Sequence, residues 1–117
     1  TLYKAPKPAD FGAYVRALQS NLRERGRMAA TRGAMGRQAE CYGRAVDVTC
    51  PVRIVMGTKD PDFPDPAADA EYARQLFGAH TDTTVAMIDG AGHYPHAELP
   101  VDTASAILPF LAGVVHA

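Results

Sequence analysis

Several features that would place this chain in a specialised class are missing from its sequence. The 117 residues include only two cysteines, Cys41 and Cys50, too few for a disulfide framework and without the spacing of a zinc site. We expect both to be small buried hydrophobic side chains in a reducing compartment. Because no run of about 18 apolar residues and no signal-peptide pattern occurs, the sequence predicts a cytoplasmic protein without a membrane span.

Net charge is also nearly absent. A formal charge of −1 gives no general attraction for nucleic acid or a membrane surface, and 47% hydrophobic residues indicate one modest globular domain. Residues 1–50 nevertheless carry nine Lys/Arg against four Asp/Glu, whereas residues 51–117 carry three against nine. The arginines of the first half could form a basic patch, but no aromatic residues are interleaved, which favours a solvated helical face. Five of the seven arginines would form this patch: Arg23, Arg25, Arg27, Arg32 and Arg37.

The first 49 residues predict helices and no strand. After a lead-in rich in Pro and Lys, Asp10 is a candidate N-cap for an amphipathic helix that ends by Gly26. Its apolar residues recur at helical spacing: Phe11, Tyr14, Val15, Leu18 and Leu22. Residues 28–46 predict a second helix, weakened by three glycines that each cost about 1 kcal/mol relative to alanine.

Residues 52–115 follow the order strand, loop, helix, strand, loop, helix. The stretch "VRIVM" (52–56) predicts a strand that is apolar on both faces, and "TTVAMI" (83–88) predicts a second strand. Asp65 followed by Pro66 is an N-cap and first-turn pair for the helix between them. This order is typical of an α/β fold with parallel strands.

The C-terminal helix is expected to begin near Pro100. Its predicted buried stripe consists of Ala104, Ile107, Leu108 and Leu111. Pro109 lies inside this helix, where it removes a hydrogen bond, so we expect a bend rather than two separate helices.

Two loops follow the predicted strands, and each carries a residue with catalytic potential. A right-handed crossover makes the strands parallel, so the Asp60 loop and the His93 loop leave the same edge of the sheet. A carboxylate beside an imidazole is the acid and base pair of a catalytic triad. Gly90 and Gly92 allow a sharp turn that aims His93 over the strand ends. The alternative interpretation is an ordinary turn with a surface histidine.

These segments resemble the C-terminal part of the α/β-hydrolase family. "CPVRIVMGTKDPDFPDP" is similar to a late strand with the catalytic-acid loop, and "VAMIDGAGHYPHAELPVDTASAILPFL" is similar to the last strand, the histidine loop and the closing helix. The resemblance implies residues 1–49 as the end of a lid with connecting helices, and 50–117 as the β-α-β-α part of the hydrolase core. It implies a small-molecule ester or amide-like substrate and no cofactor.

The resemblance assigns His93 as the triad base and Asp60 as its acid, with Asp62 as the alternative acid. His96, Glu98 and Tyr94 would order the loop or line a pocket. A metal pair of His93 and His96 lacks a third ligand of suitable spacing, so no metal site is predicted.

The largest departure from the family is the absence of a nucleophile elbow, G-x-S-x-G. The two serines, Ser20 and Ser105, both lie in helical patterns without flanking glycines. The chain begins with Thr1, and we expect it to be the C-terminal segment of a larger hydrolase, inactive alone. An N-terminal part, a second chain or a swapped copy would complete the sheet. The alternatives are a non-catalytic fragment, or part of a haloalkane dehalogenase or epoxide hydrolase with an aspartate nucleophile.

Overall fold

The computed structural model describes residues 2–35 and 38–115. The chain divides into two compact units, one formed by Thr1–Lys7 with Val46–Ala117 and the other by Pro8–Ala45. In the part of the chain that is described, no helix has the length and apolar character needed to cross a membrane.

The Pro8–Ala45 unit is helical. It contains α1 (Phe11–Arg23) and α2 (Arg27–Met35), and the 3₁₀ helix η1 (Gln38–Asp47) begins in it. Asp10 occupies the predicted N-cap of α1, but its side chain makes no capping hydrogen bond. Although the apolar residues of α1 recur at helical spacing, none of its side chains is buried.

Two expectations for this region are wrong. Residues 28–46 do not form one α-helix, because η1 has 3₁₀ geometry; glycines such as Gly43 weaken an α-helix, which is consistent with this change. Cys50 is exposed rather than buried. The side chain of Cys41, and residues 36–37 with Arg37 of the expected basic face, lie outside what is described.

The other unit has the predicted α/β arrangement. Its helices and strands are β1 (Val52–Gly57), α3 (Pro66–Gly78), β2 (Thr83–Ile88), α4 (Pro95–Glu98) and α5 (Pro100–Val115). The two strands are parallel and form a two-stranded sheet, with Val52 opposite Thr83 and Gly57 opposite Ile88. The predicted cap of α3 is confirmed, since the Asp65 carboxylate accepts a 3.0 Å hydrogen bond from the Ala68 N–H.

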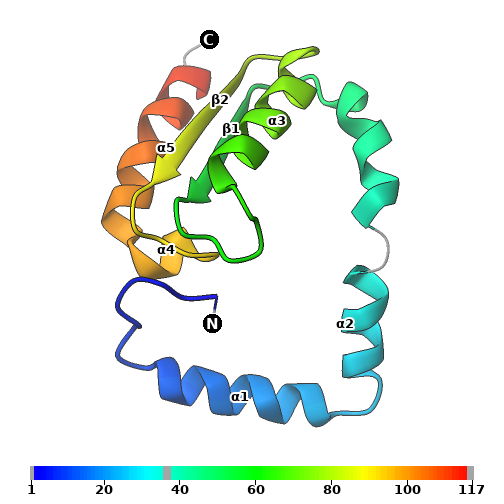
Figure 1. The fold of residues 1–117 in the computed structure, drawn as a ribbon, viewed down its shortest axis with the longest axis vertical. Helices are drawn as coiled ribbons and strands as arrows, with labels where there is room; N and C mark the ends of the chain where they lie inside the picture. Colours follow the sequence, from blue (N-terminus) through cyan, green and yellow to red (C-terminus); the bar gives the residue numbers. More distant parts are fainter. Residues whose placement is uncertain (1, 36–37, 116–117) are drawn as a thin grey trace. The chain divides into compact units, whose positions relative to one another are not determined.

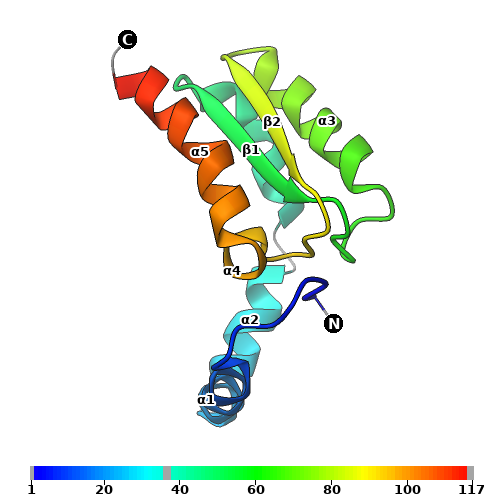
Figure 2. The same ribbon diagram turned by 90° about the vertical axis from the view of Figure 1, so that its left-hand side faces the viewer.

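The sheet lies between two helices. Figures 1 and 2 show α3 on one face and α5 on the other, and both helices contact both strands. The arrowheads of β1 and β2 lie at the same end of the sheet, and the short helix α4 follows β2 at that end. The loops that follow β1 and β2 therefore leave the same edge of the sheet.

The face of α5 that packs on the sheet differs from the predicted stripe. Thr103 is buried, and Ile107 and Phe110 are half-buried, whereas Leu108 is 62% and Leu111 48% exposed. Ala104 is exposed as well. Because α5 is apolar on several sides, its sequence does not determine which side meets the sheet. Pro109 lies inside one continuous helix, as expected.

The apolar core of this unit is small. Strand residues Val52–Met56 are all only half-buried, and no large side chain is fully buried among the described residues. Among the described residues of this unit, the buried apolar side chains are those of Ala70, Ile88, Ala91 and Pro95. A strand that is apolar on both faces normally has helices and further strands around it.

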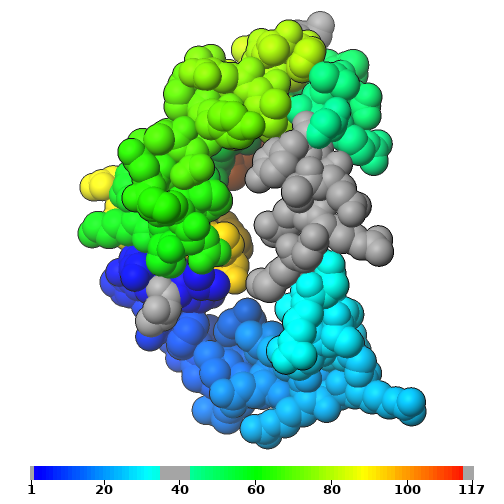
Figure 3. All heavy atoms as spheres, turned by 45° about the vertical axis from the view of Figure 1, so that its right-hand side comes forward, coloured from blue at the N-terminus to red at the C-terminus, as the bar shows by residue number. Residues whose placement is uncertain are grey.

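The N-terminal residues 2–7 belong to this unit as well. Figure 3 shows this segment (blue) next to the loop that follows β1 (green) and near α4. Its backbone is joined to the His93 loop, since the His93 N–H donates a 2.9 Å hydrogen bond to the Leu2 carbonyl.

Candidate functional site

The loops after β1 and β2 are tied together by backbone and side-chain hydrogen bonds. The Lys59 N–H donates to the Ala91 carbonyl at 2.9 Å. The Thr58 hydroxyl donates to Asp89 Oδ1 at 3.2 Å and accepts from the Gly90 N–H at 2.9 Å. Thr58, the first residue after β1, therefore links its own loop to the turn at Asp89 and Gly90 that follows β2. These hydrogen bonds hold the two loops against each other.

Glycines allow the two loops to approach closely. A Cβ atom on Gly57 would collide with the carbonyl oxygens of Ala91 and Gly92 and would lie 2.7 Å from the Ala91 carbonyl carbon. Gly90 has a φ of 77°, a left-handed conformation that residues with a side chain rarely adopt. The end of β1 and the histidine loop thus require glycine for different reasons, one steric and one conformational.

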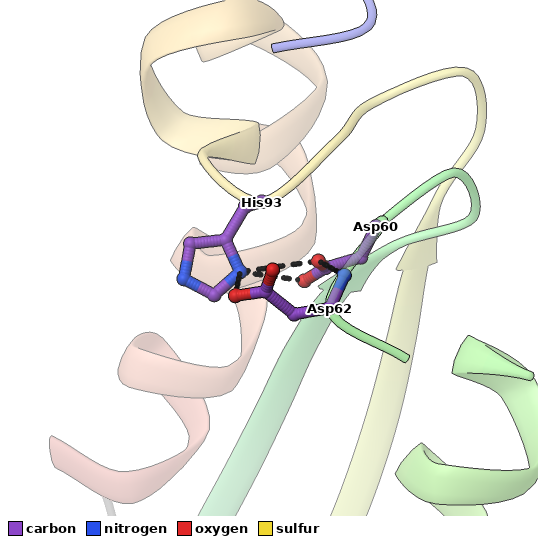
Figure 4. A group of neighbouring side chains, drawn as sticks. All are labelled: Asp60, Asp62 and His93. Atoms are coloured by element: carbon purple, nitrogen blue, oxygen red, sulfur yellow. Dashed lines mark hydrogen bonds and ion pairs between the residues drawn. The ribbon is translucent and has the colours of Figure 1, made fainter. Parts of the chain in front are cut away.

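Asp60 and His93 meet at this edge of the sheet. Figure 4 shows the imidazole facing the carboxylate, with His93 Nδ1 2.9 Å from Asp60 Oδ2 and 3.1 Å from Oδ1. The Asp60 side chain is 5% exposed and that of His93 34%. Asp60 Oδ1 also accepts a 3.0 Å hydrogen bond from the Asp62 N–H, which fixes the carboxylate. The structure brings the predicted acid and base into direct contact.

This contact determines the tautomer of His93. An ionised carboxylate only accepts hydrogen bonds, so Nδ1 carries the hydrogen and donates it to Asp60. Nε2 then has its lone pair free to accept a proton, and it points away from both carboxylates (Figure 4). An imidazole held in this way has the orientation of a general base.

Asp62, the alternative acid, lies at the outer side of the pair. Its Oδ2 atom is 3.5 Å from His93 Nδ1, and its side chain is 51% exposed. It is farther from the ring than Asp60 and is surrounded by more water, which screens its charge. The geometry therefore favours Asp60 as the partner of the ring.

The same three side chains could hold a metal ion. One ligand atom from each of Asp60, Asp62 and His93 lies within 4.8 Å of the others. His96, the other member of the histidine pair considered from the sequence, is not part of this group. A metal bound here would replace the hydrogen on Nδ1, because a ring nitrogen that binds a metal is deprotonated.

Tyr94, His96 and Glu98 follow His93 and have different surroundings. The Tyr94 ring meets that of His93 edge-on, with centroids 4.9 Å apart and an interplanar angle of 84°. His96 is exposed and meets Tyr94 at 6.2 Å. Glu98 is buried at the end of α4, a short helix that the sequence patterns did not indicate.

The Glu98 carboxylate has an unusual set of partners. Burial raises the pKa of Glu98, and backbone N–H groups of Ala5, Lys4, Gly92 and Tyr94 lower it by more, so the net pKa lies below its ordinary value. Glu98 is therefore a buried carboxylate that stays charged because four backbone groups donate to it.

Comparisons with known proteins do not identify the site. A scan against protein-family models finds no match, and neither curated proteins nor solved structures show significant similarity to the chain. The case for a function at this edge of the sheet therefore rests on its geometry.

Proposed function

We propose that this chain is the C-terminal segment of an α/β-hydrolase that supplies the acid and base of a Ser-His-Asp triad. The observation that carries the proposal is the 2.9 Å contact between His93 Nδ1 and the buried Asp60 carboxylate. The two residues come from loops at the carboxyl ends of neighbouring parallel strands, the edge at which α/β sheets bind ligands. The nucleophile would come from outside residues 1–117, since no G-x-S-x-G stretch occurs within them.

In the proposed reaction His93 acts through Nε2. Nε2 takes the proton of a serine hydroxyl as the serine oxygen attacks the carbonyl carbon of a small ester or amide-like substrate. Asp60 holds the ring and stabilises the imidazolium. His93 returns the proton to the leaving group as the acyl-enzyme forms. Water then attacks the acyl group with the same base, which releases the acid and restores the serine.

The incomplete sheet supports a larger assembly. Among the described residues the sheet has two strands, so each has one edge without a strand partner. Val52–Met56 are half-buried, although their sequence suits a strand that is enclosed on both faces. The exposed side of α5 bears Val101, Leu108 and Leu111, which are 75%, 62% and 48% exposed. Further strands from an upstream segment, a second chain or a swapped copy would cover these surfaces.

The helices before the core would serve as part of a lid. Residues 1–49 are proposed to shape the substrate pocket, with Tyr3, Phe11, Tyr14 and Met35 as candidate pocket residues. The Tyr3 ring lies 5.3 Å from that of Tyr94, next to the proposed base, whereas Tyr14 is 49% exposed. The side chain of Met35 lies outside the described residues.

The test is to isolate the protein from its native source and measure its intact mass, then to treat it with a fluorophosphonate probe. We expect a larger parent polypeptide or a bound partner chain, with the probe attached to a serine in that other part. Labelling of residues 1–117 alone would contradict the proposal. An unlabelled parent with an aspartate at the elbow would indicate a haloalkane dehalogenase or epoxide hydrolase. Absence of any further segment or partner would indicate a non-catalytic protein.

A further inference from the structure

The carboxylate of Glu98 collects backbone N–H groups from two distant parts of the chain. Oε2 accepts from the Lys4 and Ala5 N–H groups at 2.7 Å each. The Gly92 N–H lies 3.1 Å from both carboxylate oxygens, and the Tyr94 N–H donates to Oε1 at 3.2 Å. Glu98 is 6% exposed, so these donors take the place of water around its charge.

Two of these donors lie on either side of His93. Glu98 holds the amides of residues 92 and 94, and the amide between them, that of His93, donates to the Leu2 carbonyl at 2.9 Å. Three successive N–H groups of the histidine loop are thus fixed, two by Glu98 and one by the N-terminal segment. The Tyr3 ring, 5.3 Å from that of Tyr94, packs over the same place.

We infer that Glu98 is a positioning residue that orients the His93 ring toward Asp60, with residues 2–5 as part of the same clamp. The His93 side chain is 34% exposed, and both carboxylates near it, Asp60 at 2.9 Å and Asp62 at 3.5 Å, lie at the same ring nitrogen, Nδ1. The direction of the ring therefore also depends on how its backbone is fixed. The importance of this clamp for a reaction rests on the proposed function, but the clamp itself is a property of the described residues.

The chemistry of the clamp requires a carboxylate. Two carboxylate oxygens offer about four lone-pair sites, which suits the four N–H groups found here. A glutamine would present one oxygen and an NH₂ group, and the latter would face N–H donors to which it cannot bond. Glu98→Gln therefore opens the clamp with almost no change in side-chain size.

The test uses the full 117-residue chain labelled with ¹⁵N at histidine. In the wild type we expect His93 to show one tautomer by NMR, with a protonated Nδ1 whose hydrogen exchanges slowly with water. In E98Q we expect this hydrogen to exchange at least tenfold faster and the single tautomer to be lost, while amide protection in β1 and β2 persists. E71Q is the matched control, because Glu71 is exposed on α3 and bonded to Arg74; His93 should be unchanged in it.

A second variant opens the clamp without altering a charge. A Cβ atom on Gly92 would collide with the Leu2 carbonyl oxygen and lie 3.0 Å from Glu98 Oε1, so G92A should reproduce the effect of E98Q. In the control G113A the added methyl group meets no atom within 4 Å, and His93 should stay as in the wild type.

Two results would overturn the inference that Glu98 positions His93. Unchanged His93 signals in folded E98Q and G92A would overturn the inference. Loss of β1 and β2 protection in both variants would also overturn it, because Glu98 would then hold the fold as a whole. Since these measurements need no nucleophile, failure of the fluorophosphonate test leaves their result intact, and the reverse is also true.

Discussion

The carboxyl edge of the sheet and the body of the sheet differ in how complete they are. At the edge, Asp60, Ala91 and Glu98 are 6%, 0% and 6% exposed, and the loops are joined by many hydrogen bonds. In the body, every residue of β1 before Gly57 is half-buried and the outer side of α5 is exposed. The polar residues at the edge are thus well enclosed by the described residues, whereas the apolar side chains of β1 are only half-buried. The contacts among these polar residues need only the two loops and the N-terminal residues 2–5. An apolar core needs layers on both sides of the sheet.

The largest effect is expected from removing the imidazole of His93, the proposed base at the carboxyl edge of the sheet. In the hydrolase proposed above, His93→Ala should lower kcat/KM by roughly four to six orders of magnitude, because the proposed nucleophile would lose its proton acceptor. The free energy of unfolding, measured by urea denaturation, should change little, since His93 is partly exposed. Activity that survives this change would disprove the assignment.

The contrast in burial predicts a contrast in stability. Ile88→Ala should destabilise the isolated chain by about 2–5 kcal/mol, because Ile88 is 5% exposed at the end of β2. Leu108→Ala should change it by about 0.5 kcal/mol or less, because that side chain is 62% exposed. Urea denaturation of both variants checks this difference. Equal losses would mean that the α5 surface is already covered in the chain by itself.

A single added methyl group on Gly57 should disturb the close approach of the loops that follow β1 and β2. Gly57→Ala should lower the free energy of unfolding by about 1–3 kcal/mol, because its Cβ would meet the carbonyl groups of Ala91 and Gly92. The contact between His93 and Asp60 should loosen as well, which the Nδ1 hydrogen reports by NMR. Gly113→Ala, in open space on α5, provides the control.

Acid should weaken the clamp that Glu98 forms at the carboxyl edge of the sheet. The pKa of Glu98 is lower in the folded chain than in the unfolded chain, so its contribution to stability is fully present above about 4.5, the ordinary value, and is lost as the pH falls through the folded value. In E98Q this part of the pH dependence should vanish from urea midpoints measured between pH 7 and 3. The same slope in both proteins would show that other carboxylates cause it.

Glu71 is a useful comparison for this titration. Its pKa is lowered to about 2 by hydrogen bonds from Arg74 and Gln75, yet it lies exposed on α3, away from the loops that carry Asp60 and His93 in sequence. E71Q should therefore leave the acid release of the His93 loop as it is in the wild type.

The two strands and the long helices α3 and α5 were predictable from local patterns. "TTVAMI" forms β2 with the expected limits, and the Asp65–Pro66 pair starts α3. The proximity of Asp60 and His93 also followed, because parallel strands deliver their ends to one edge. Asp60 was the preferred acid and Asp62 the alternative, and the structure places Asp60 nearer to the ring, at 2.9 Å against 3.5 Å.

Three features could not have been derived from periodicity. The prediction of the buried stripe of α5 was wrong, because Ala104 and Leu108 are exposed. A helix that is apolar on several sides can pack on the sheet with more than one of them. Helix α4 is a single turn, too short to show a period. The clamp at Glu98 joins residues at opposite ends of the chain, and no local signal marks such a pair.

The sequence by itself determined the order of strands and helices, the parallel crossover and the edge from which a carboxylate and an imidazole emerge, because short-range periodicity and chain chirality govern these. Tertiary structure alone decided that the Asp60 oxygens reach Nδ1, that Glu98 gathers amides from residues 4, 5, 92 and 94, and that the strands stay half-covered. Those outcomes depend on contacts between residues far apart in the chain, where small differences in packing direction settle which atoms meet.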